Sequence, residues 1–574
     1  MKQSGELRRV ITGLKHGGHA IVDGAPDVAE ALEVGSVLLS ELTQEPDLAK
    51  VDEREAFAIV GTTDFDYMFP DLVGDPTKHL PAEDAAAVDK TVKALNALGK
   101  AMIEQEPPAD LKNSPIPPIY TYWGQFVDHD LTAATDNDTV IGIRDVPLPP
   151  LDPDEVRAKL KNARTPALNL DSLYGDGPFA PEAPPGSQKV VVPYQVADKA
   201  KLQIGELTAV PVGVRIPPID DMARDLPRIN KKPQVGDTRN DENLVVAQLH
   251  VAFIRFHNAA VDWVRRNEPE RTGVGAVFTR ARDLTRWTYQ WLSVHDFLAT
   301  VTAPVTVDTV LVNDDDLLGL GSRSKPYMPL EFSVAAYRFG HSMIRGTYDW
   351  NRNFGRPGNN TAPVATFDQL FQFTGTGGFA GGALTLPSNW PVEWDRFVDK
   401  NSLFGDRFAR RIDTHLALPL STMKNQLEGE PCTLPPDTKD LVVHLARRNL
   451  LRGYRLGLPT GQAVAEALGI PALTEDQLKQ GVDPKIVEAL EDGNLIDRTP
   501  LWFYVLRESE RNERGNALGA VGSRIVAETI IGQIRHDPAS YLHQSSWTPS
   551  DGVRLPDGSP VRSIADFLRF AGVL

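Results

Sequence analysis

A histidine between two aspartates is the first candidate for chemistry in this chain. Asp128, His129 and Asp130 end an aromatic, largely apolar stretch that begins at Tyr120. In a helix, Gln125, Asp128 and His129 would stand at i, i+3 and i+4 and share one face. Asp130 would point about 100° away from His129 and serve another neighbour. The stretch therefore offers an imidazole for proton transfer, or only a capped helix end.

Residues 235–243 place an arginine and a glutamate at the start of a long expected helix. Arg239 carries a permanent charge, and Glu242 suits the positive end of that helix. Asn240 or Asp241 can cap it. The alternative is an acidic first turn that follows an arginine by chance.

Two further stretches could hold a flat group that carries a metal. Residues 337–344 form an apolar run with helical pattern, in which Gly340 would let such a group lie close to the backbone beside His341. In a later arginine-rich stretch, Asn449 and Arg452 stand one helical turn apart. A single histidine on an apolar helix is more often a core residue, and so these motifs gain weight only together.

In this order along the chain, the four stretches resemble the motifs of the animal-type haem peroxidase superfamily, also called the peroxidase-cyclooxygenase superfamily. Trp123–Asp130 is similar to its distal-helix motif, Gly236–Arg239 to its catalytic-arginine motif and Arg338–His341 to its proximal-histidine motif. The resemblance covers about residues 60 to 545 and ends near Gly522–Glu528. Because all four stretches occur in the family's order, the chain is identified as a member of this superfamily. It has a single cysteine, unlike the secreted, disulfide-bonded animal enzymes, and so we expect a bacterial member.

The resemblance implies a mainly α-helical fold, with haem buried between central helices and few short strands. We expect one large haem peroxidase domain at residues 61–574, because no flexible linker, low-complexity tract or internal repeat divides the chain. Residues 1–60 lie before the resemblance and would be an N-terminal extension of unknown role. Residues 84–105 have the pattern of an amphipathic helix.

By resemblance, three residues take catalytic roles in the reduction of hydrogen peroxide. His129 would accept a proton from the peroxide and return it to the departing oxygen. Arg239 would offer donors where negative charge develops during O–O cleavage. Gln125 would hold distal water or a halide. The expected activity is that of a haem peroxidase, which forms a ferryl intermediate and then oxidises a halide, a pseudohalide or another small anionic or aromatic donor.

Six residues match positions that hold the haem in the resembling enzymes. His341 would bind the iron, and Asn449 would accept a hydrogen bond from the second nitrogen of that ligand. Two arginines would pair with the haem propionates, and two carboxylates would form ester bonds to the methyl groups of haem b. The arginines are Arg338 and Arg452, and the carboxylates are Asp128 and Glu242. The alternative for the carboxylates is helix capping.

A loop after the distal stretch suits a hard cation. Alternate residues of an extended loop project to one side, and oxygens in such a row are ligands that calcium prefers. The alternating residues are Thr165, Ala167, Asn169 and Asp171. The resemblance implies a calcium site completed by Asp130, although Asn169 stands where an aspartate is usual and Asp171 where a serine is usual. An ordinary polar turn is the alternative.

Two other classes of function remain open. Fatty-acid dioxygenases share the haem scaffold, but they carry a radical tyrosine three residues before the proximal histidine. Here Arg338 has that place and Tyr337 stands one position earlier, about 100° further round a helix. A non-catalytic interaction protein on the same scaffold would have no need of the complete set of site residues.

The remaining histidines are expected to be structural. His250 and His257 stand seven residues apart, on one face of the helix that follows Arg239. That spacing is compatible with metal binding, but hydrogen bonding in the core is the more frequent role. His444, close to Asn449, is expected to be structural as well.

Composition excludes some partners. The formal net charge of −17 argues against binding to nucleic acid or to an anionic membrane surface. No run of 18 apolar residues is present, and so no transmembrane segment is expected. The N-terminus lacks the apolar core of a signal peptide, and the single cysteine, Cys432, cannot form an internal disulfide. We expect a cytoplasmic bacterial protein, or one exported without a classical signal peptide.

Overall fold

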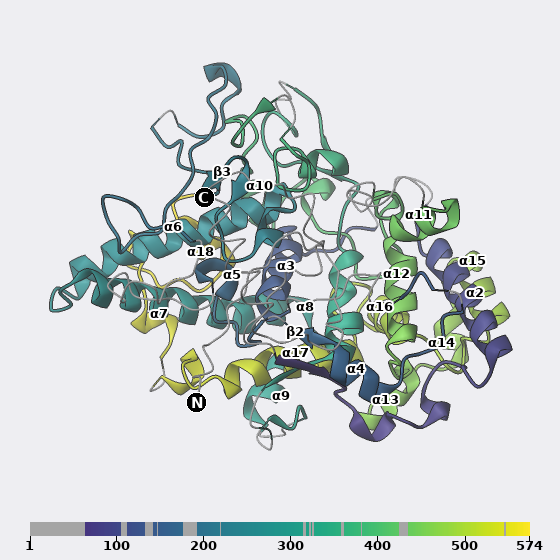
Figure 1. Ribbon diagram of the computed structural model, residues 1–574. Coiled ribbons are helices and arrows are strands. Elements are labelled where there is room, and N and C mark those ends of the chain that lie inside the picture. Colours follow the sequence, from purple (N-terminus) through teal and green to yellow (C-terminus); the bar gives the residue numbers. More distant parts are fainter. Residues whose placement is uncertain are drawn as a thin grey trace, which may run out of the picture.

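The computed structural model is mainly helical, as predicted, with a few short strands (Figure 1). It describes residues 63–574, except for residues 105–111, 133–141, 146, 163, 176–191, 219, 314–316, 321–322, 324–325, 357–360, 380–381, 424–433 and 545–546. The N-terminal extension predicted at residues 1–60 and the single cysteine, Cys432, lie outside the described residues.

The α-helices of the described chain range from one turn to almost seven. They are α2 Ala85–Ala101, α3 Ile119–Leu131, α4 Pro153–Lys159, α5 Asp171–Tyr174, α6 Leu244–Asn267, α7 Val274–Leu292, α8 Ala299–Val301, α9 Thr306–Val312, α10 Asp395–Val398, α11 Pro436–Val442, α12 Leu445–Arg455, α13 Gly461–Ala467, α14 Glu475–Lys479, α15 Pro484–Asp492, α16 Leu501–Asn512, α17 Ala520–His536 and α18 Ile564–Phe570.

The strands form three small sheets. In the first, β1 Thr63–Asp66 pairs antiparallel with β2 Lys161–Asn162 and parallel with β5 Tyr327–Pro329. The other two are hairpin-like pairs: β3 Arg228–Ile229 with β4 Lys232–Pro233, and β6 Thr347–Tyr348 with β7 Ala365–Thr366.

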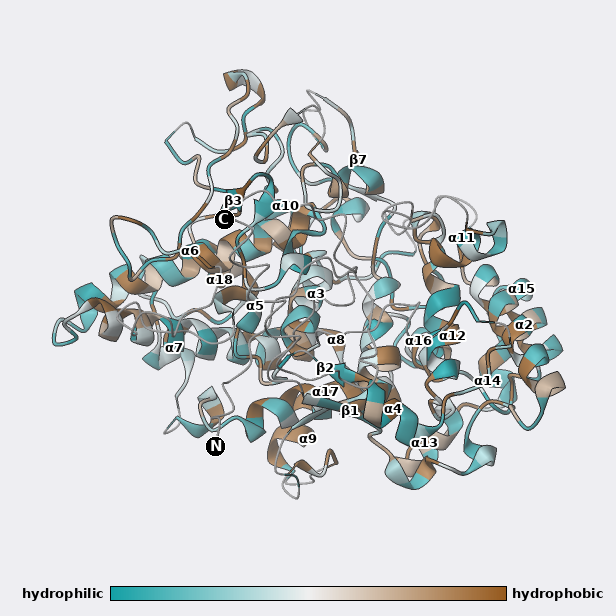
Figure 2. Ribbon diagram, viewed as in Figure 1, coloured by the Kyte–Doolittle hydropathy of each residue, from teal (hydrophilic) through white to brown (hydrophobic). Residues whose placement is uncertain are grey.

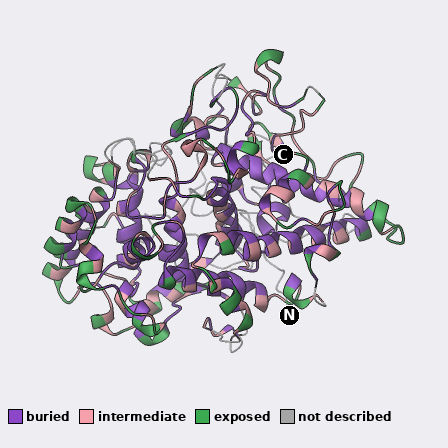
Figure 3. Cartoon of the chain, turned by 180° about the vertical axis from the view of Figure 1, so that it is seen from behind, coloured by how far each residue is buried: buried purple, intermediate pink, exposed green. Residues whose placement is uncertain are grey.

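Helix α6 is the longest element and runs through the core. Its N-cap is Asn243, whose side chain accepts from Val246 N at 3.1 Å, so the prediction that Asn240 or Asp241 caps this helix is wrong. Residues Thr238–Asp241 form a separate 3₁₀ turn before it. By length and hydropathy α6 could cross a membrane, yet 83% of its most apolar window is buried inside the protein, as in a core helix (Figures 2 and 3).

Helix α3 lies near the centre of the molecule in Figure 1, and it contacts both α6 and the segment Ala336–His341. Its buried side packs closely, since the rings of Phe126 and Phe253 stack at 4.2 Å. Gly124 permits a tight approach, because a Cβ there would lie 3.1 Å from the ring of Phe297. The opposite side of α3, including Gln125 and Asp128, stays partly exposed. One face of this central helix is therefore available to a site.

The segment before His341 is helical but not regularly α-helical, contrary to the prediction of a simple helical run. A π-helix covers Glu331–Ala335 and a 3₁₀-helix covers Ala336–His341. The buried Glu331 carboxylate accepts from Met68 N at 2.8 Å, and Arg338 Nε donates to Ser333 O at 2.9 Å. These contacts hold the wider and tighter turns in place, and such irregular turns are frequent at functional sites.

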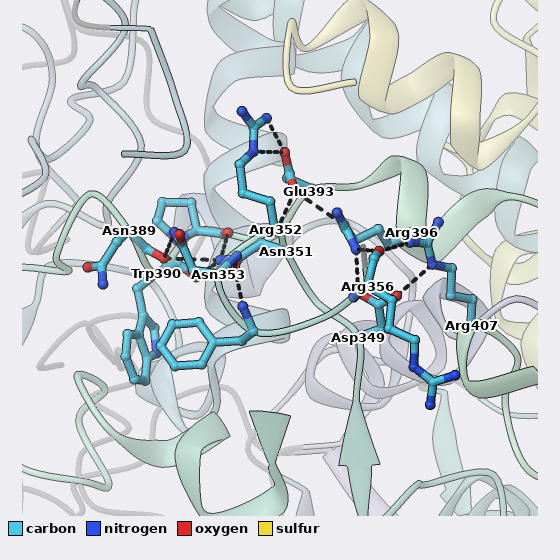
Figure 4. Close-up of polar contacts among 12 residues, drawn as sticks. Asp349, Asn351, Arg352, Asn353, Arg356, Asn389, Trp390, Glu393, Arg396 and Arg407 are labelled. Atoms are coloured by element: carbon cyan, nitrogen blue, oxygen red, sulfur yellow. Dashed lines mark hydrogen bonds and ion pairs between the residues drawn. The ribbon is translucent and has the colours of Figure 1, made fainter. Parts of the chain in front are cut away.

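A buried charge cluster fixes the loops that follow β6 (Figure 4). The Asp349 carboxylate, fully buried, pairs with Arg396 and with Arg407 Nε, the latter at 2.8 Å. Nearby, Glu393 pairs with Arg352. The Asn351 amide donates to three successive backbone carbonyls at residues 389–391. These contacts join residues 349–356 to residues 389–407. We therefore assign this region a structural role.

The C-terminal helix α18 braces the distal side of the core. Phe567 stacks on Phe256 at 4.4 Å and meets Trp123 of α3 edge-on at 5.5 Å. Asp296 joins the two helices, since it accepts from Tyr120 Oη and from Ile564 N, each at 2.7 Å. The packing of α3 therefore depends on residues far along the chain.

Replacing Phe567 by alanine should cost about 3–5 kcal/mol of unfolding free energy, because the ring is fully buried and its cavity cannot collapse easily. Chemical denaturation measured by circular dichroism would test this. As a control, Leu574→Ala at an exposed position should change the stability by less than about 0.5 kcal/mol. Equal effects of the two substitutions would contradict the bracing role of α18.

Candidate active site

His129 lies completely buried on the inner side of α3, and its Nδ1 is 2.8 Å from Asn240 Oδ1. Because an amide oxygen only accepts, His129 donates from Nδ1 and carries its lone pair at Nε2. Burial, and then the positive charge of Arg239, lowers the pKa of His129 to about 3. The ring is therefore neutral near pH 7 and is able to take up a proton.

The guanidinium of Arg239 is held directly against the backbone of α3. Its Nη2 donates to His129 O at 3.0 Å, to Thr132 O at 2.6 Å and to Asp237 Oδ2 at 2.7 Å. Its Nε also faces the Asp237 carboxylate, at 3.2 Å. Among the described residues, Nη1 donates no hydrogen bond, so that end of the fork can serve a ligand.

Asp237 pairs with a second buried arginine, Arg164, whose Nη2 lies 2.5 Å from Asp237 Oδ2. Burial raises the pKa of Asp237, but Arg239 and Arg164 outweigh burial and hold it well below the usual range. Arg164 Nε also donates to His129 O, at 3.1 Å. The His129 backbone is thus held by two arginines that share one carboxylate.

Gln125 and Glu242 approach each other from α3 and from the residues before α6. The Gln125 amide donates to the Glu242 carboxylate and accepts from Asn243 Nδ2 at 3.1 Å. Burial raises the pKa of Glu242 to about 8, against the opposing effect of Arg239. Asp128, one turn along α3, accepts from Thr132 Oγ1 at 3.0 Å, and burial raises its pKa. Burial therefore raises the pKa of both carboxyl groups.

The second half of the site is built around His341, which is 6% exposed. Its Nδ1 lies 2.9 Å from the amide nitrogen of Asn449 on α12. Burial, and then the charges of Arg338, Arg452 and Arg448, holds the pKa of His341 well below its usual value. A neutral imidazole surrounded by three cationic side chains suits a metal that arrives with negatively charged groups.

A direct contact shows that the two halves are adjacent. Tyr337, four residues before His341, donates from Oη to Gly124 O of α3 at 3.1 Å. The Tyr337 ring also stacks on Phe332 at 4.5 Å. The helix of His129 and the segment of His341 therefore face each other across a short distance.

The residues around His341 fit a haem. A Cβ added to Gly340 would meet nothing within 4 Å, so open space lies beside the histidine. The Asn449 Oδ1 atom is buried and has no hydrogen-bond partner among the described residues. If the amide turns, that oxygen accepts from His341 Nδ1, which leaves the lone pair at Nε2 for a metal. A single neutral histidine with a free lone pair at Nε2 is the protein ligand that haem iron commonly has on one face.

The loop predicted to bind calcium contacts Asp130 through backbone hydrogen bonds, but its backbone is not extended throughout. Leu170 N and Ser172 N donate to the Asp130 carboxylate at 3.0 and 3.2 Å. Leu168 and Leu170 adopt left-handed backbone conformations, with φ of 46° and 63°, so the predicted alternation of side chains is wrong. Burial and the nearby Asp171 raise the pKa of Asp130 to about 6.

The other predicted ligands of this loop also take part in hydrogen bonds, two of them within the loop and one with α7. Thr165 O accepts from Ala167 N at 2.8 Å, and Asn169 Oδ1 accepts from Asp171 N at 3.2 Å. The Ala167 carbonyl accepts from Gln290 Nε2 at 3.3 Å. Carbonyl, amide and carboxylate oxygens are ligands that calcium prefers, and so the chemistry of the donor set still fits calcium.

Comparison with protein families decides the relationship. The model of the family described as "Animal haem peroxidase" matches residues 199–528, more than half of the chain. The chain belongs to the animal haem peroxidase family. The mainly helical architecture of the family is also found in the solved structure of peroxidase A from Dictyostelium discoideum, with a TM-score of 0.54, 16% identity, and coverage of 83% of this chain and 88% of that one.

Individual relatives match only part of the chain. A peroxidase-like protein of Margaritifera margaritifera is 30% identical over 148 residues, which are 25% of this chain and 18% of that protein. Heme peroxidase 2 of Caenorhabditis elegans is 21% identical over 335 residues, which are 57% of this chain and 42% of its own length. The chain thus spans less than half the length of these relatives, and activity, substrate and partners are left to proposal.

Several residues of the candidate site were missed by reasoning from sequence. Arg164 and Asp237 hold the distal side, Arg448 stands beside Arg452, and Asn240 contacts His129. Asp237 lies inside the arginine motif, Asn240 follows it directly and Arg448 precedes Asn449, so their positions could have indicated them, but nothing local marks Arg164. The expectation for His257 is confirmed, since Tyr174 Oη and Ala200 O contact its two ring nitrogens at 2.9 and 3.0 Å.

Proposed function

We propose that this protein is a haem peroxidase that reduces hydrogen peroxide and oxidises a small donor, a halide, a pseudohalide or an aromatic compound. Membership of the animal haem peroxidase family supports the class of reaction. The observation that carries the proposal is His129, buried and neutral, with its ring fixed by Asn240 and its backbone fixed by Arg239. An imidazole in this state is a general base that needs no prior deprotonation.

Haem b would supply the iron that binds peroxide and takes up its oxidising equivalents. His341 would hold the iron, and Asn449 would fix the orientation and tautomer of the ring. Arg338 and Arg452 would face the propionates, and the charge of Arg448 would add to theirs. These roles use side chains that are at most 8% exposed, which keeps water away from the site.

The distal residues would divide the work on peroxide. His129 Nε2 accepts the proton of one peroxide oxygen and delivers it to the other, which leaves as water. Arg239 directs a permanently charged donor toward the oxygen on which negative charge develops. Gln125, held by Glu242 and Asn243, positions water or a halide beside them. No proton is lost to solvent in this sequence, and none has to be supplied.

Purified protein reconstituted with haem should consume hydrogen peroxide only when a donor such as iodide, thiocyanate or a phenol is present in excess, and should oxidise that donor in proportion. Oxygen uptake with a long-chain fatty acid is the competing result. Tyr337 argues against that outcome, because its phenol is bonded to Gly124 O. Fatty-acid oxygenation without donor oxidation would overturn the proposal.

We propose further that calcium binds between Asp130 and the loop of residues 165–171. The support is electrostatic: two carboxylates, Asp130 and Asp171, are buried close enough to raise the pKa of Asp130. A divalent cation would offset that repulsion and attach the loop to the distal helix.

Prolonged chelation should therefore remove one calcium per chain and lower the midpoint of thermal unfolding, since a bound ion stabilises the folded state by mass action. Metal analysis before and after chelation would measure this, and added calcium should restore the midpoint. Asp171→Asn should weaken binding, whereas Asp154→Asn, at an exposed position on α4, should not. Active protein that contains no calcium would exclude the site.

We also propose ester bonds from Asp128 and Glu242 to the haem. Each bond would replace a C–H bond of a haem methyl group by a C–O bond, with hydrogen peroxide as the two-electron oxidant that is reduced to two molecules of water. Both carboxyl groups are partly exposed on the face of the site, and burial raises the pKa of each, so each has access to the neutral form that an ester resembles. After small additions of peroxide, acid–acetone extraction should leave haem on the protein. Asp128→Asn combined with Glu242→Gln should make all haem extractable at unmodified mass. Complete extraction from the unaltered protein would exclude the bonds.

A further inference from the structure

Asn240 stands between two buried histidines. Its Oδ1 lies 2.8 Å from His129 Nδ1, and its Nδ2 lies 2.9 Å from His250 Nδ1. The three side chains come from α3, from the turn Thr238–Asp241 and from α6, and none is more than 1% exposed. They form one hydrogen-bonded chain that ends on the histidine proposed to transfer protons.

The chain has a direction, because the two ends of an amide are different. Asn240 donates from nitrogen to His250, so His250 Nδ1 must carry a lone pair and its proton is at Nε2. Asn240 then accepts at oxygen from His129, whose proton is at Nδ1 and whose lone pair is at Nε2. If the amide turned round, both histidines would exchange tautomers, and His129 would lose the lone pair that accepts a proton.

His250 does not have the contacts of an ordinary core histidine. Its Nε2 is buried and has no hydrogen-bond partner among the described residues, and its hydrogen bond goes to Asn240. His257, seven residues later on the same helix, is equally buried but has a partner at each nitrogen. A buried polar atom without a partner lowers stability, so packing alone would favour an apolar residue at position 250.

We propose that Asn240 and His250 are positioning residues that hold His129 in the tautomer able to accept a proton from peroxide. This inference rests on the proposed peroxidase function of the same site. His250 sets the orientation of the amide, and the amide sets the tautomer of His129. Neither residue touches the peroxide.

The test compares three kinds of substitution in the haem-loaded protein. Asn240→Leu removes both ends of the amide and should slow the second-order reaction with hydrogen peroxide about 10–100-fold. Asn240→Asp keeps an acceptor for His129 Nδ1 and should recover most of that loss. His250→Phe lets the amide turn and should slow the reaction less than Asn240→Leu. In the double variant the two effects should not add, because both act through one chain.

Two readouts separate positioning from general damage. Turnover at saturating peroxide and limiting donor should change little, so the loss should fall on the peroxide step alone. The rate of cyanide binding should fall in parallel, since hydrogen cyanide must also give up a proton in the distal site but undergoes no turnover. His257→Phe is the matched control: it removes an equally buried imidazole from α6 and should leave the peroxide and cyanide rates within about twofold.

Each outcome decides between the two claims. If His129→Ala slows the peroxide reaction but Asn240→Leu does not, the positioning role is wrong and the proposed function stands. An Asn240→Asp protein as slow as Asn240→Leu would also reject control of the tautomer. If Asn240→Leu fails to fold, the other two variants still test the positioning role. The proposal requires His250→Phe to react with peroxide more slowly than Asn240→Asp. An unaltered protein that binds haem but does not react with peroxide would overturn the proposed function itself.

Discussion

Replacing His129 by alanine is expected to slow the reaction with hydrogen peroxide by about 10²–10⁴-fold and to leave haem binding intact. The substitution removes the group that takes the peroxide proton, whereas the proposed iron ligand His341 and its partner Asn449 lie on other elements. Stopped-flow mixing of haem-loaded protein with peroxide would measure the second-order rate from the change in absorbance. The Soret band before mixing would report the haem content.

The pH dependence of the unaltered protein follows from the same residue. Burial and Arg239 lower the pKa of His129 to about 3, so the ring is neutral and competent above that pH and becomes protonated only below it. Between about pH 5 and 8 the rate should therefore show no loss from titration of this group, although an ordinary histidine would titrate there. An acid limb near the usual histidine pKa, present in the unaltered protein and absent from His129→Ala, would contradict the buried, neutral state.

His257→Ala provides the control for His129→Ala, because His257 is equally buried and its hydrogen bonds go to Tyr174 and Ala200. It should reduce stability without slowing the peroxide step. If both variants lose the rate equally, or if His129→Ala keeps it, the assignment of His129 as the base is wrong.

The helical class and the placement of the main site residues were predictable because their signals are local. His129 and Gln125 stand one helical turn apart on α3, as their spacing predicts, although His129 is fully buried and Gln125 is partly exposed. Asn449 and Arg452 stand on α12 as their spacing indicates. A motif whose members lie within one or two turns carries its own geometry, and the family's order of motifs supplied the rest.

What could not be predicted depends on contacts between residues far apart in sequence. Arg164 and Asp237 are 73 residues apart, and no pattern in either stretch indicates that they pair. Gly236 shows the same limit: a Cβ there would lie 2.4 Å from Asp171 O, so the glycine is required by a loop more than 60 residues earlier. Asn240 is a residue type that often caps helices. Only the positions of His129 and His250 in the fold show that its side chain bridges two histidines.

Local irregularity was the other source of error. The residues before His341 have the apolar pattern of an α-helix, yet they fold as a π-turn followed by a 3₁₀ turn. The reason is tertiary: the Glu331 carboxylate is held by backbone groups of Met68 and Phe69, next to β1. Hydrophobic spacing does not distinguish these helix types, because all of them bury one side.

Replacing His341 by alanine is expected to abolish normal haem binding. His341 is the neutral imidazole next to open space at Gly340, and Asn449 is placed to orient its ring. Without the imidazole, the charged groups that remain around position 341 are Arg338, Arg448 and Arg452, which cannot ligate a metal because they stay protonated. Purified His341→Ala protein should therefore show a large loss of the Soret band, or a band at the position of haem without a protein ligand.

His444→Ala is the matched control for that experiment. His444 lies at the N-terminus of α12, where its ring accepts from Arg447 N, and it is 8% exposed, much like His341. Its removal should cost about 1 kcal/mol as a lost cap and should leave the Soret band unchanged. Imidazole added to His341→Gly protein should restore part of the band, because the space beside Gly340 can admit a small ring. A native spectrum in His341→Ala protein would show that iron is held elsewhere, and the site would have to be rebuilt around another ligand.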